Sequence, residues 1–296
     1  MGETKNIIVA FQGEHGAFSE MAARLYFGKD VEVVPQRNFS ALFAAVAHGK
    51  CTHGMVPIEN SLMGSIHENY DHLSAHHLQI IGELKLHIVH NLIVNPGVKL
   101  EDIRHIYSQA PALAQCTQFT ASLSQAETVM TADTAGAVKA LKTSGARDAA
   151  AIASAQAAWD YDLEILQTGI EDDHQNYTRF LVVTSEALSP ENPDIQMPAK
   201  TSIVFAMKNV PGALFKSLSV FALRDLNLLK IESRPLAGKP WEYAFSLDFE
   251  GHIRQEPCAR AIEHLREIAT FVKILGSYRQ GDMVEGKVWK REKNKM

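Results

Sequence analysis

Four clusters of polar side chains interrupt the apolar runs in the first part of this 296-residue sequence. Their members include hydroxyls, amides, carboxylates and one arginine. The clusters are Gln12–Ser19, Pro57–Ser61, Ser108–Pro111 with Gln115, and Asn176–Arg179. An arginine in such a set binds a carboxylate through two hydrogen bonds, and the hydroxyls place weak acids near a leaving group. The clusters therefore predict a site that binds a carboxylate and assists a departing group.

The fourth cluster lies in the stretch QNYTRF, directly before the apolar run FLVVT. A short apolar run between polar residues is typical of a strand that is covered on both faces, and ligands of open α/β sheets usually bind where such strands end. A second interpretation is structural. Asn176 and Thr178 would then satisfy turn or capping hydrogen bonds, while Arg179 pairs with a nearby acid.

Several other chemistries lack their sequence patterns. No cysteine and histidine spacing matches a structural zinc site, although His76 and His77 are adjacent and His87 lies close to His90. The HExxH motif of metalloproteases and the GxSxG motif of serine hydrolases do not occur. We therefore expect no metal and no serine nucleophile.

Composition points to an ordinary globular protein. The formal net charge of -5 comes from mixed acids and bases, so we expect no nucleic-acid partner. The three cysteines, Cys51, Cys116 and Cys258, are odd in number and far apart, which favours free thiols in a reducing compartment. No apolar run is long enough for a signal peptide or a membrane span. The sequence thus predicts a soluble cytoplasmic protein with no membrane partner.

Short apolar runs alternate with helical patterns, which predicts an α/β fold with mostly parallel strands. The expected strands are Asn6–Phe11, Val31–Val34, Gly54–Ile58, Ile103–Tyr107, Thr128–Met130, Ala149–Ala153 and Phe180–Thr184. Gly13 and Gly16 indicate a tight turn from the first strand into a helix. The start of that helix would direct free backbone N–H groups at an anion, although a plain turn fits the two glycines equally well.

The long strand-like segment Gln79–Val94 is interrupted by Gly82, as expected where a chain passes from one lobe to another. A return near Trp159–Thr168 would divide a first domain, residues 1–186, into two lobes. Lobe 1 would be about 1–80 with 161–186, and lobe 2 about 81–160. Small-molecule sites tend to lie in the cleft between such lobes.

Residues 187–199 are rich in Pro, Ser, Glu and Asp, which indicates a linker. Beyond it, residues 200–280 predict a βαββαβ domain of ferredoxin-like plan, with apolar residues alternating along Trp241–Phe249. Helices would cover one face of its sheet and leave the other available to a second subunit. Residues 281–296 are basic and polar, and we expect a frayed tail.

Several of these stretches together resemble one enzyme family, the prephenate dehydratases. NYTRF resembles the family's TRF motif, and FQGEHGAFSEMAA, VPIENS and IYSQAPALAQC are similar to its other catalytic motifs, in the expected order. PGALFKSLSVFALRDLNLLKIESRP resembles the GALF and ESRP motifs of the family's ACT regulatory domain. The resemblance covers residues 6–280. It implies a two-lobed, periplasmic-binding-protein-like catalytic domain followed by a ferredoxin-like ACT domain.

The resemblance also implies a reaction: prephenate loses carbon dioxide and hydroxide to give phenylpyruvate in phenylalanine biosynthesis. The substrate carboxylate releases its electrons into the ring, and the ring hydroxyl must be protonated as it leaves. Because the product ring is aromatic, no cofactor is needed. A general acid typically contributes about two to four powers of ten in rate to such a step.

The family's catalytic threonine corresponds to Thr178, whose hydroxyl would donate to the departing hydroxide. Glu59 is the candidate for a carboxyl that feeds this relay, with a surface acid as the alternative. Arg179 would either bind the substrate carboxylate or brace its loop, and the sequence leaves both open. The amides and hydroxyl that would hold the substrate are Asn60, Ser108, Gln115 and Asn176. Lys139 stands where the family often has a glutamate, which argues against an essential role for that acid here.

In the second domain the resemblance implies feedback inhibition by phenylalanine, bound between two ACT domains of a homodimer or homotetramer. The expected ligand-binding residues are Gly212, Ala213, Leu214, Phe215, Glu232, Ser233, Arg234 and Pro235. Two rival functions remain open. One is an arogenate dehydratase, which performs the same reaction on a substrate that carries an amino acid side chain. The other is a sensor that binds phenylalanine without turnover.

Overall fold

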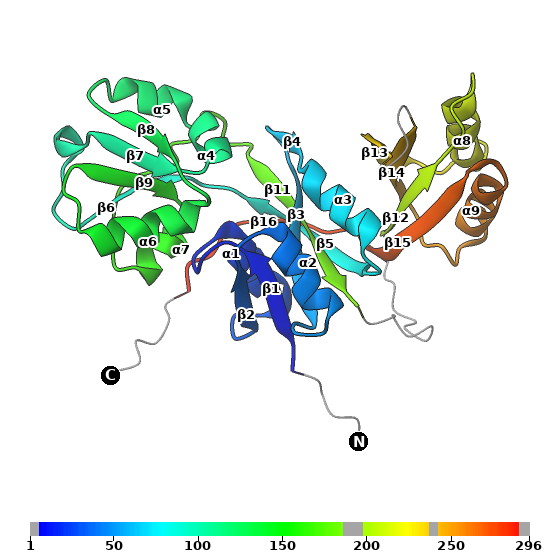
Figure 1. Cartoon of the computed structure of the whole chain (residues 1–296), viewed down its shortest axis with the longest axis horizontal. Helices are drawn as coiled ribbons and strands as arrows, with labels where there is room; N and C mark the ends of the chain where they lie inside the picture. Colours follow the sequence, from blue (N-terminus) through cyan, green and yellow to red (C-terminus); the bar gives the residue numbers. More distant parts are fainter. Residues whose placement is uncertain (1–5, 186–197, 237–241, 290–296) are drawn as a thin grey trace. The chain divides into compact units, whose positions relative to one another are not determined.

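A computed structural model describes residues 6–185, 198–236 and 242–289 of the chain (Figure 1). The chain forms two compact units. The first comprises Met1–Asn69, Leu84–Phe180 and Met283–Met296, and the second comprises Tyr70–Glu83 and Leu181–Asp282. Most of the predicted linker, 187–199, lies outside the described residues. None of the helices in the described ranges is both long enough and apolar enough to cross a membrane.

The first sheet has seven strands in the order β16-β5-β11-β3-β1-β2, with β4 paired to β3. The strands are β1 (Ile8–Gln12), β2 (Glu32–Gln36), β3 (His53–Asn60), β4 (Gly64–Ser65), β5 (Gln79–His87), β11 (Tyr177–Thr184) and β16 (Met283–Val284). Strand β1 runs parallel to both β2 and β3, so the carboxyl ends of these strands meet at one edge. Helices α1 (Phe18–Phe27), α2 (Phe39–Ala47) and α3 (His67–Ala75) follow β1, β2 and β4.

The second sheet has the order β10-β6-β9-β7-β8 and forms the green part of Figure 1 with its helices. Its strands are β6 (Asn91–Val94), β7 (His105–Ser108), β8 (Glu127–Met130), β9 (Ala149–Ala153) and β10 (Glu164–Thr168). Its helices are η1 (Leu100–Asp102), α4 (Ala110–Ala114), α5 (Thr117–Ser122), α6 (Thr134–Ser144) and α7 (Ala155–Asp160). Strand β7 is parallel to β8 and β9, whereas β6 runs antiparallel to β9 and β10.

The chain passes between these two sheets later than the sequence indicates. Gly82 lies inside β5, and the break between the two sheets falls at residues 88–90. There the His90 backbone N–H donates to the Glu171 carboxylate at 2.8 Å instead of to a neighbouring strand. The return occupies residues 169–176, because β10 still belongs to the second sheet. The expected limits of lobe 2, 81–160, are therefore about ten residues too early at both ends.

The third sheet is antiparallel, in the order β13-β14-β12-β15. Its elements are β12 (Ala199–Ala206), α8 (Ala213–Ala222), β13 (Leu228–Pro235), β14 (Tyr243–Glu250), α9 (Glu256–Ile268) and β15 (Phe271–Arg279). Apolar residues from both helices pack on one sheet face around Phe205, Phe221 and Phe249. This is the expected βαββαβ plan, and with the two sheets above it confirms the predicted fold class. Trp241, the predicted start of the third strand, lies outside the described residues.

The expectation of a frayed tail is wrong for residues 281–289. Met283 and Val284 form β16 and pair in parallel with β5. Further on, the Trp289 backbone N–H donates to Gln156 Oε1 at 2.7 Å, and Gln156 Nε2 donates to the Trp289 carbonyl at 3.1 Å. We call residues 283–289 the C-terminal strap. It joins the first sheet at β5 and then α7, beside the second sheet, while residues 290–296 lie outside the described part.

Candidate active site

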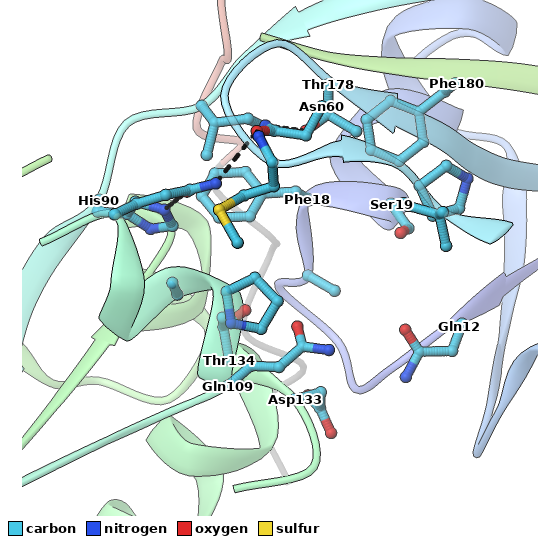
Figure 2. A pocket seen from close by; sticks show the side chains of 18 of the residues that line it. Gln12, Phe18, Ser19, Asn60, His90, Gln109, Asp133, Thr134, Thr178 and Phe180 are labelled. Carbon is cyan, nitrogen blue, oxygen red and sulfur yellow. Dashed lines mark hydrogen bonds between the residues drawn. The ribbon is translucent and has the colours of Figure 1, made fainter. Parts of the chain in front are cut away.

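A cavity of about 360 Å³ opens within the first unit and is lined by side chains that follow strands of both its sheets. Figure 2 shows the polar groups that converge on it. They are Gln12, Ser19, Asn60, His90, Gln109, Gln115, Asp133, Thr134 and Thr178. The volume lies within the range typical of small-molecule sites. Three of these residues, Asn60, Gln115 and Thr178, belong to the set that the sequence predicts.

Asn60, the last residue of β3, has an amide orientation that its neighbours determine. Its Oδ1 lies 3.0 Å and 2.9 Å from the backbone N–H groups of Leu62 and Met63, which can only donate. Its Nδ2 lies 3.2 Å from the Tyr177 carbonyl oxygen, which can only accept. The same Nδ2 group contacts Thr178 Oγ1 at 3.1 Å. Asn60 therefore donates to the Thr178 hydroxyl.

Gln115 continues this chain of amides away from Thr178. Its Nε2 group donates to Asn60 Oδ1 at 3.2 Å, so its Oε1 faces the other way. That oxygen accepts from Asn176 Nδ2 at 2.9 Å and lies 2.8 Å from His90 Nε2. Asn176 is fully buried, and its Oδ1 accepts from Asn60 Nδ2 at 2.7 Å. Asn176 thus holds Asn60 and Gln115 in place without lining the cavity.

Thr178 lies on β11, where alternate side chains point to opposite faces. Thr178 and Phe180 line the cavity, and Arg179 between them does not. Since Thr178 Oγ1 accepts from Asn60, the single hydroxyl proton is left to point elsewhere. None of the described residues accepts a hydrogen bond from that hydroxyl, and the side chain borders the cavity.

Glu59 and Arg179 do not line the cavity, so neither the expected relay acid nor an arginine partner for the substrate carboxylate borders it. Each precedes or follows a cavity residue on its strand, so their side chains lie on the other face of the sheet. There Arg179 Nη1 lies 3.9 Å from Glu59 Oε2, and the arginine side chain is 10% exposed. Of the two roles left open for Arg179, this placement fits the brace and not the carboxylate partner.

Ser108 is a second displaced candidate. It is fully buried at the end of β7, and its hydroxyl donates to the Ile152 carbonyl oxygen at 2.6 Å. The hydroxyl therefore ties β7 to the neighbouring strand β9 instead of binding a ligand. The next residue, Gln109, lines the cavity in its place.

Charge in the cavity differs from the expectation of an arginine. All residues that line the cavity lie in the described part of the chain. No lysine or arginine is among them, and Asp133 is their one formally charged side chain. Asp133 caps α6, with its Oδ1 accepting from the Gly136 backbone N–H at 2.7 Å. The first residues of α1, Phe18 and Ser19, also border the cavity. Free N–H groups at such helix starts favour anions.

Six of the nine polar cavity residues were not predicted as site residues. Gln12, Ser19 and Gln109 belong to the predicted clusters without being predicted as site residues, and Asp133 and Thr134 lie outside those clusters. His90 carried no signal beyond a histidine pair. It is 2% exposed, and burial lowers its pKa most strongly, against smaller raising effects of the Gln115 hydrogen bond and the Glu171 charge. The imidazole is therefore neutral at pH 7.

The structure gives the surroundings of two further side chains, Lys139 and Cys116. Lys139, which the sequence comparison set where the family often has a glutamate, forms an exposed ion pair with Glu14 at 3.0 Å. Cys116 follows Gln115 and is fully buried; burial and the charges of Glu171 and Asp172 raise the pKa of its thiol to about 12. A thiol of that pKa stays protonated, so it is not a nucleophile. In the described ranges no group of three His, Cys, Asp or Glu residues is arranged to hold a metal ion.

A smaller cavity, of about 220 Å³, lies at the start of α8 in the second unit. Gly212, Ala213, Leu214 and Phe215 line it, together with Tyr243 and others. The other predicted group, Glu232–Pro235, does not line it. Instead, Arg234 pairs with Asp71 at 2.8 Å, and Glu232 lies 3.8 Å from Lys230. Within one chain, only the first of the two predicted groups therefore borders this cavity.

Comparisons with known proteins agree with one another on the family. A family model described as prephenate dehydratase matches residues 9–188. The chain is 44% identical over 279 residues to arogenate dehydratase/prephenate dehydratase 2 of Arabidopsis thaliana, covering 91% of this chain and 72% of that protein. It is 32% identical to a crystal structure of prephenate dehydratase in complex with L-Phe from Arthrobacter aurescens, with a TM-score of 0.85 over 92% of this chain and 90% of that one.

A third relative has a different description. A solved structure of GqqA, described as a novel type of quorum quenching acylase, is 34% identical with a TM-score of 0.83, covering 92% of this chain and 97% of that one. The comparisons also correct one expectation. The Arabidopsis thaliana relative is named as a chloroplastic enzyme, which contradicts the cytoplasmic location that the sequence predicts.

Proposed function

This chain belongs to the prephenate dehydratase family, and we propose that it converts prephenate to phenylpyruvate, carbon dioxide and water. The observation that carries the proposal is the Asn60 to Thr178 hydrogen bond of 3.1 Å at the wall of the cavity. In the reaction, the bond between the ring and its carboxylate breaks, and its electrons enter the ring. The bond to the ring hydroxyl breaks at the opposite side, and the departing oxygen needs a proton.

Thr178 is the group that we assign to the departing oxygen. A threonine hydroxyl is a weak acid by itself. Here Asn60 donates to its oxygen, and Gln115 in turn donates to Asn60, so each bond polarises the next in the same direction. The chain ends in one O–H group beside the cavity, where it stabilises the hydroxide as it forms.

The two carboxylates of prephenate require positive electrostatic potential. Among the described residues, no lysine or arginine lines the cavity to supply it. We assign them to the helix starts and to neutral amides. Ser19 and the N-terminus of α1 offer N–H donors, and Gln12 and Gln109 offer amide donors. Closing water out of such a site would strengthen these bonds.

A second substrate is favoured by Asp133. Arogenate carries an ammonium where prephenate carries a keto oxygen, and a carboxylate in the cavity attracts the former and repels electron-rich oxygen. The name of the Arabidopsis thaliana relative includes both activities. We therefore propose arogenate as the alternative substrate, with Asp133 as its ammonium partner. Exchange of Asp133 for Asn should lower turnover of arogenate and leave prephenate turnover equal or higher.

The second unit is proposed to be an ACT regulatory domain that binds phenylalanine. The smaller cavity at the start of α8 has room for one amino acid, and helix N–H groups near Leu214 would hold a carboxylate. The Arthrobacter aurescens relative was solved with L-Phe bound. We propose that Glu232, Ser233, Arg234 and Pro235 of a second copy complete the site in a homodimer or homotetramer. Binding inhibits only if phenylalanine prefers a less active state of the protein.

The experiment is a set of initial rates for phenylpyruvate from prephenate and phenylalanine from arogenate, each with and without added phenylalanine. A third assay measures hydrolysis of an N-acyl amide, because a relative is described as an acylase. Prephenate turnover suppressed by phenylalanine supports the proposal, and turnover of arogenate alone retains the mechanism with the other substrate. Amide hydrolysis without either dehydration would refute it, and phenylalanine binding without any turnover would favour a sensor.

A further inference from the structure

His90 occupies an unusual position at the far end of the amide chain. It lines the cavity, is 2% exposed, and its ring lies edge-on to Phe18 with 5.6 Å between the ring centroids. Its Nε2 lies 2.8 Å from Gln115 Oε1. Its Nδ1 is buried and has no hydrogen-bond partner among the residues that the structure describes.

The tautomer of His90 follows from its neighbours. The backbone N–H groups of Leu62 and Met63 fix Asn60, and Asn60 Oδ1 requires the Gln115 NH₂ group to face it. Gln115 Oε1 therefore faces His90 and carries no proton. The hydrogen bond exists only if His90 Nε2 is protonated. Nδ1 then carries a lone pair, and the neutral ring leaves that lone pair unsatisfied.

Stability alone does not explain a histidine at this position. An unsatisfied buried acceptor destabilises a fold, and each such group calls for a specific explanation. The Nε2–H group is also not needed to satisfy Gln115, because Asn176 Nδ2 already donates to the same oxygen at 2.9 Å. An apolar ring at position 90 would remove the unsatisfied nitrogen. It would leave no other atom unsatisfied, because Gln115 Oε1 would still accept from Asn176.

We propose that His90 is a positioning residue for the dehydration, which acts through Gln115 by donating its Nε2–H to Gln115 Oε1. This inference rests on the proposed function. With two donors on its oxygen, the Gln115 amide is held in one orientation and is polarised toward Asn60. Asn60 passes the effect to the Thr178 hydroxyl. His90 thus supports the Thr178 O–H donor through three successive hydrogen bonds, from His90 to Gln115, from Gln115 to Asn60 and from Asn60 to Thr178.

Three substitutions separate the two ring nitrogens. His90→Gln places an N–H donor as many bonds from Cα as Nε2, His90→Asn places a polar group at the distance of Nδ1, and His90→Phe provides neither. His105, which lies on β7 and pairs with Glu127, is exchanged for Gln and Phe as a control. We expect kcat to fall about ten- to a hundredfold in His90→Phe and His90→Asn, and to recover largely in His90→Gln. KM should change little in all three.

Thermal unfolding distinguishes positioning from a structural role. His90→Phe should unfold at the same temperature as the wild type or higher, despite its lower kcat. If its melting temperature falls in step with its activity, or if His90→Gln is no more active than His90→Phe, the proposal is wrong.

A spectroscopic test does not depend on turnover. In protein labelled with ¹⁵N-histidine, the signal that disappears in His90→Gln identifies His90, and at pH 7 it should show a neutral ring protonated at Nε2. A ring protonated at Nδ1, or a charged ring, would overturn the inference even if the enzyme is active. A wild-type protein that dehydrates neither substrate would instead reject the proposed function, while the tautomer would still report on the hydrogen-bonded chain.

Discussion

Asn60 Nδ2 lies 3.1 Å from Thr178 Oγ1, although 118 residues separate the two in sequence. The hydrogen bond has one direction, because Asn60 Oδ1 is occupied by two backbone donors. Thr178 accepts from one side and has its own proton available to a ligand on the other. The position requires a single atom that both accepts and donates a hydrogen bond. A hydroxyl meets this requirement, whereas an amide divides the two roles between two atoms and an ionised acid only accepts.

Thr178→Val removes this hydroxyl and keeps the shape of the side chain. We expect kcat to fall by about two to four powers of ten, the range of general-acid help, with little change in melting temperature. Asn60 Nδ2 retains two acceptors, Asn176 Oδ1 and the Tyr177 carbonyl, so no donor is orphaned. Thr178→Ser is the control and should keep most activity in the same rate assay. Equal rates in the valine variant and the wild type would rule out this mechanism.

Asn60→Asp tests the direction of the chain instead of its end. The substituted carboxylate has no proton to give, so Thr178 would donate back to residue 60 and lose its role toward the ligand. The carboxylate would also face Asn176 Oδ1 and the Tyr177 carbonyl without a hydrogen. We expect kcat to fall at least a hundredfold, which corresponds to an activation barrier about 2.7 kcal/mol higher. Serine at position 178 should not restore activity to this variant, since the defect precedes the hydroxyl.

Arg179→Ala should act on stability and not on substrate binding. The side chain is 10% exposed and lies beside Glu59 on the sheet face away from the cavity. Loss of its packing and of its charge interaction with Glu59 should lower the free energy of unfolding by about 1–3 kcal/mol. KM for the substrate should stay within a factor of about three, measured below the melting temperature. Glu59→Gln gives the matched control, and a KM rise of tenfold or more in the arginine variant would restore the role of carboxylate partner.

His87 should make stability depend on pH above neutrality. Its Nδ1 and Nε2 lie 2.7 Å from Glu285 Oε2 and from the His174 carbonyl, so both nitrogens need a proton. Burial lowers the pKa of His87, but the bonds to Glu285 and His174 and the nearby negative charge together raise it above its ordinary value. A pKa raised by folding gives stability that is complete below about pH 6.5, the unfolded value, and lost as pH rises through the folded value.

The measurement compares melting temperatures of the wild type and Glu285→Gln from pH 6 to pH 9. The wild type should be more stable near pH 6, and the difference should shrink as pH rises. Since Glu285 is 72% exposed, the effect should stay within about 1 kcal/mol. A difference that stays constant from pH 6 to pH 9 would show that Glu285 is not coupled to protonation of His87, and would contradict the prediction.

The sequence predicted the two-lobed fold and three of the cavity residues because both depend on local pattern. Apolar runs mark strands, and polar residues directly after them meet at a shared edge. Strand alternation could also have separated Asn60 from Glu59, and Thr178 from Arg179, since neighbours on a strand point to opposite faces. The sequence could not predict His90, because its role depends on an amide 25 residues away, whose orientation is set by Asn60. The position of the strand break depends likewise on a distant carboxylate, Glu171.

The C-terminal strap has a consequence for how this protein can be divided. In sequence order the proposed catalytic part comes first and the proposed regulatory part second, but residues 283–289 return to the first unit. A fragment that stops at residue 186 loses β16, and the backbone edge of β5 near Lys85 and Leu86 is left without its pairing strand. Exposed strand edges recruit other chains. Such a fragment should aggregate, and a soluble version would need the strap grafted back or the edge blocked by charge or proline.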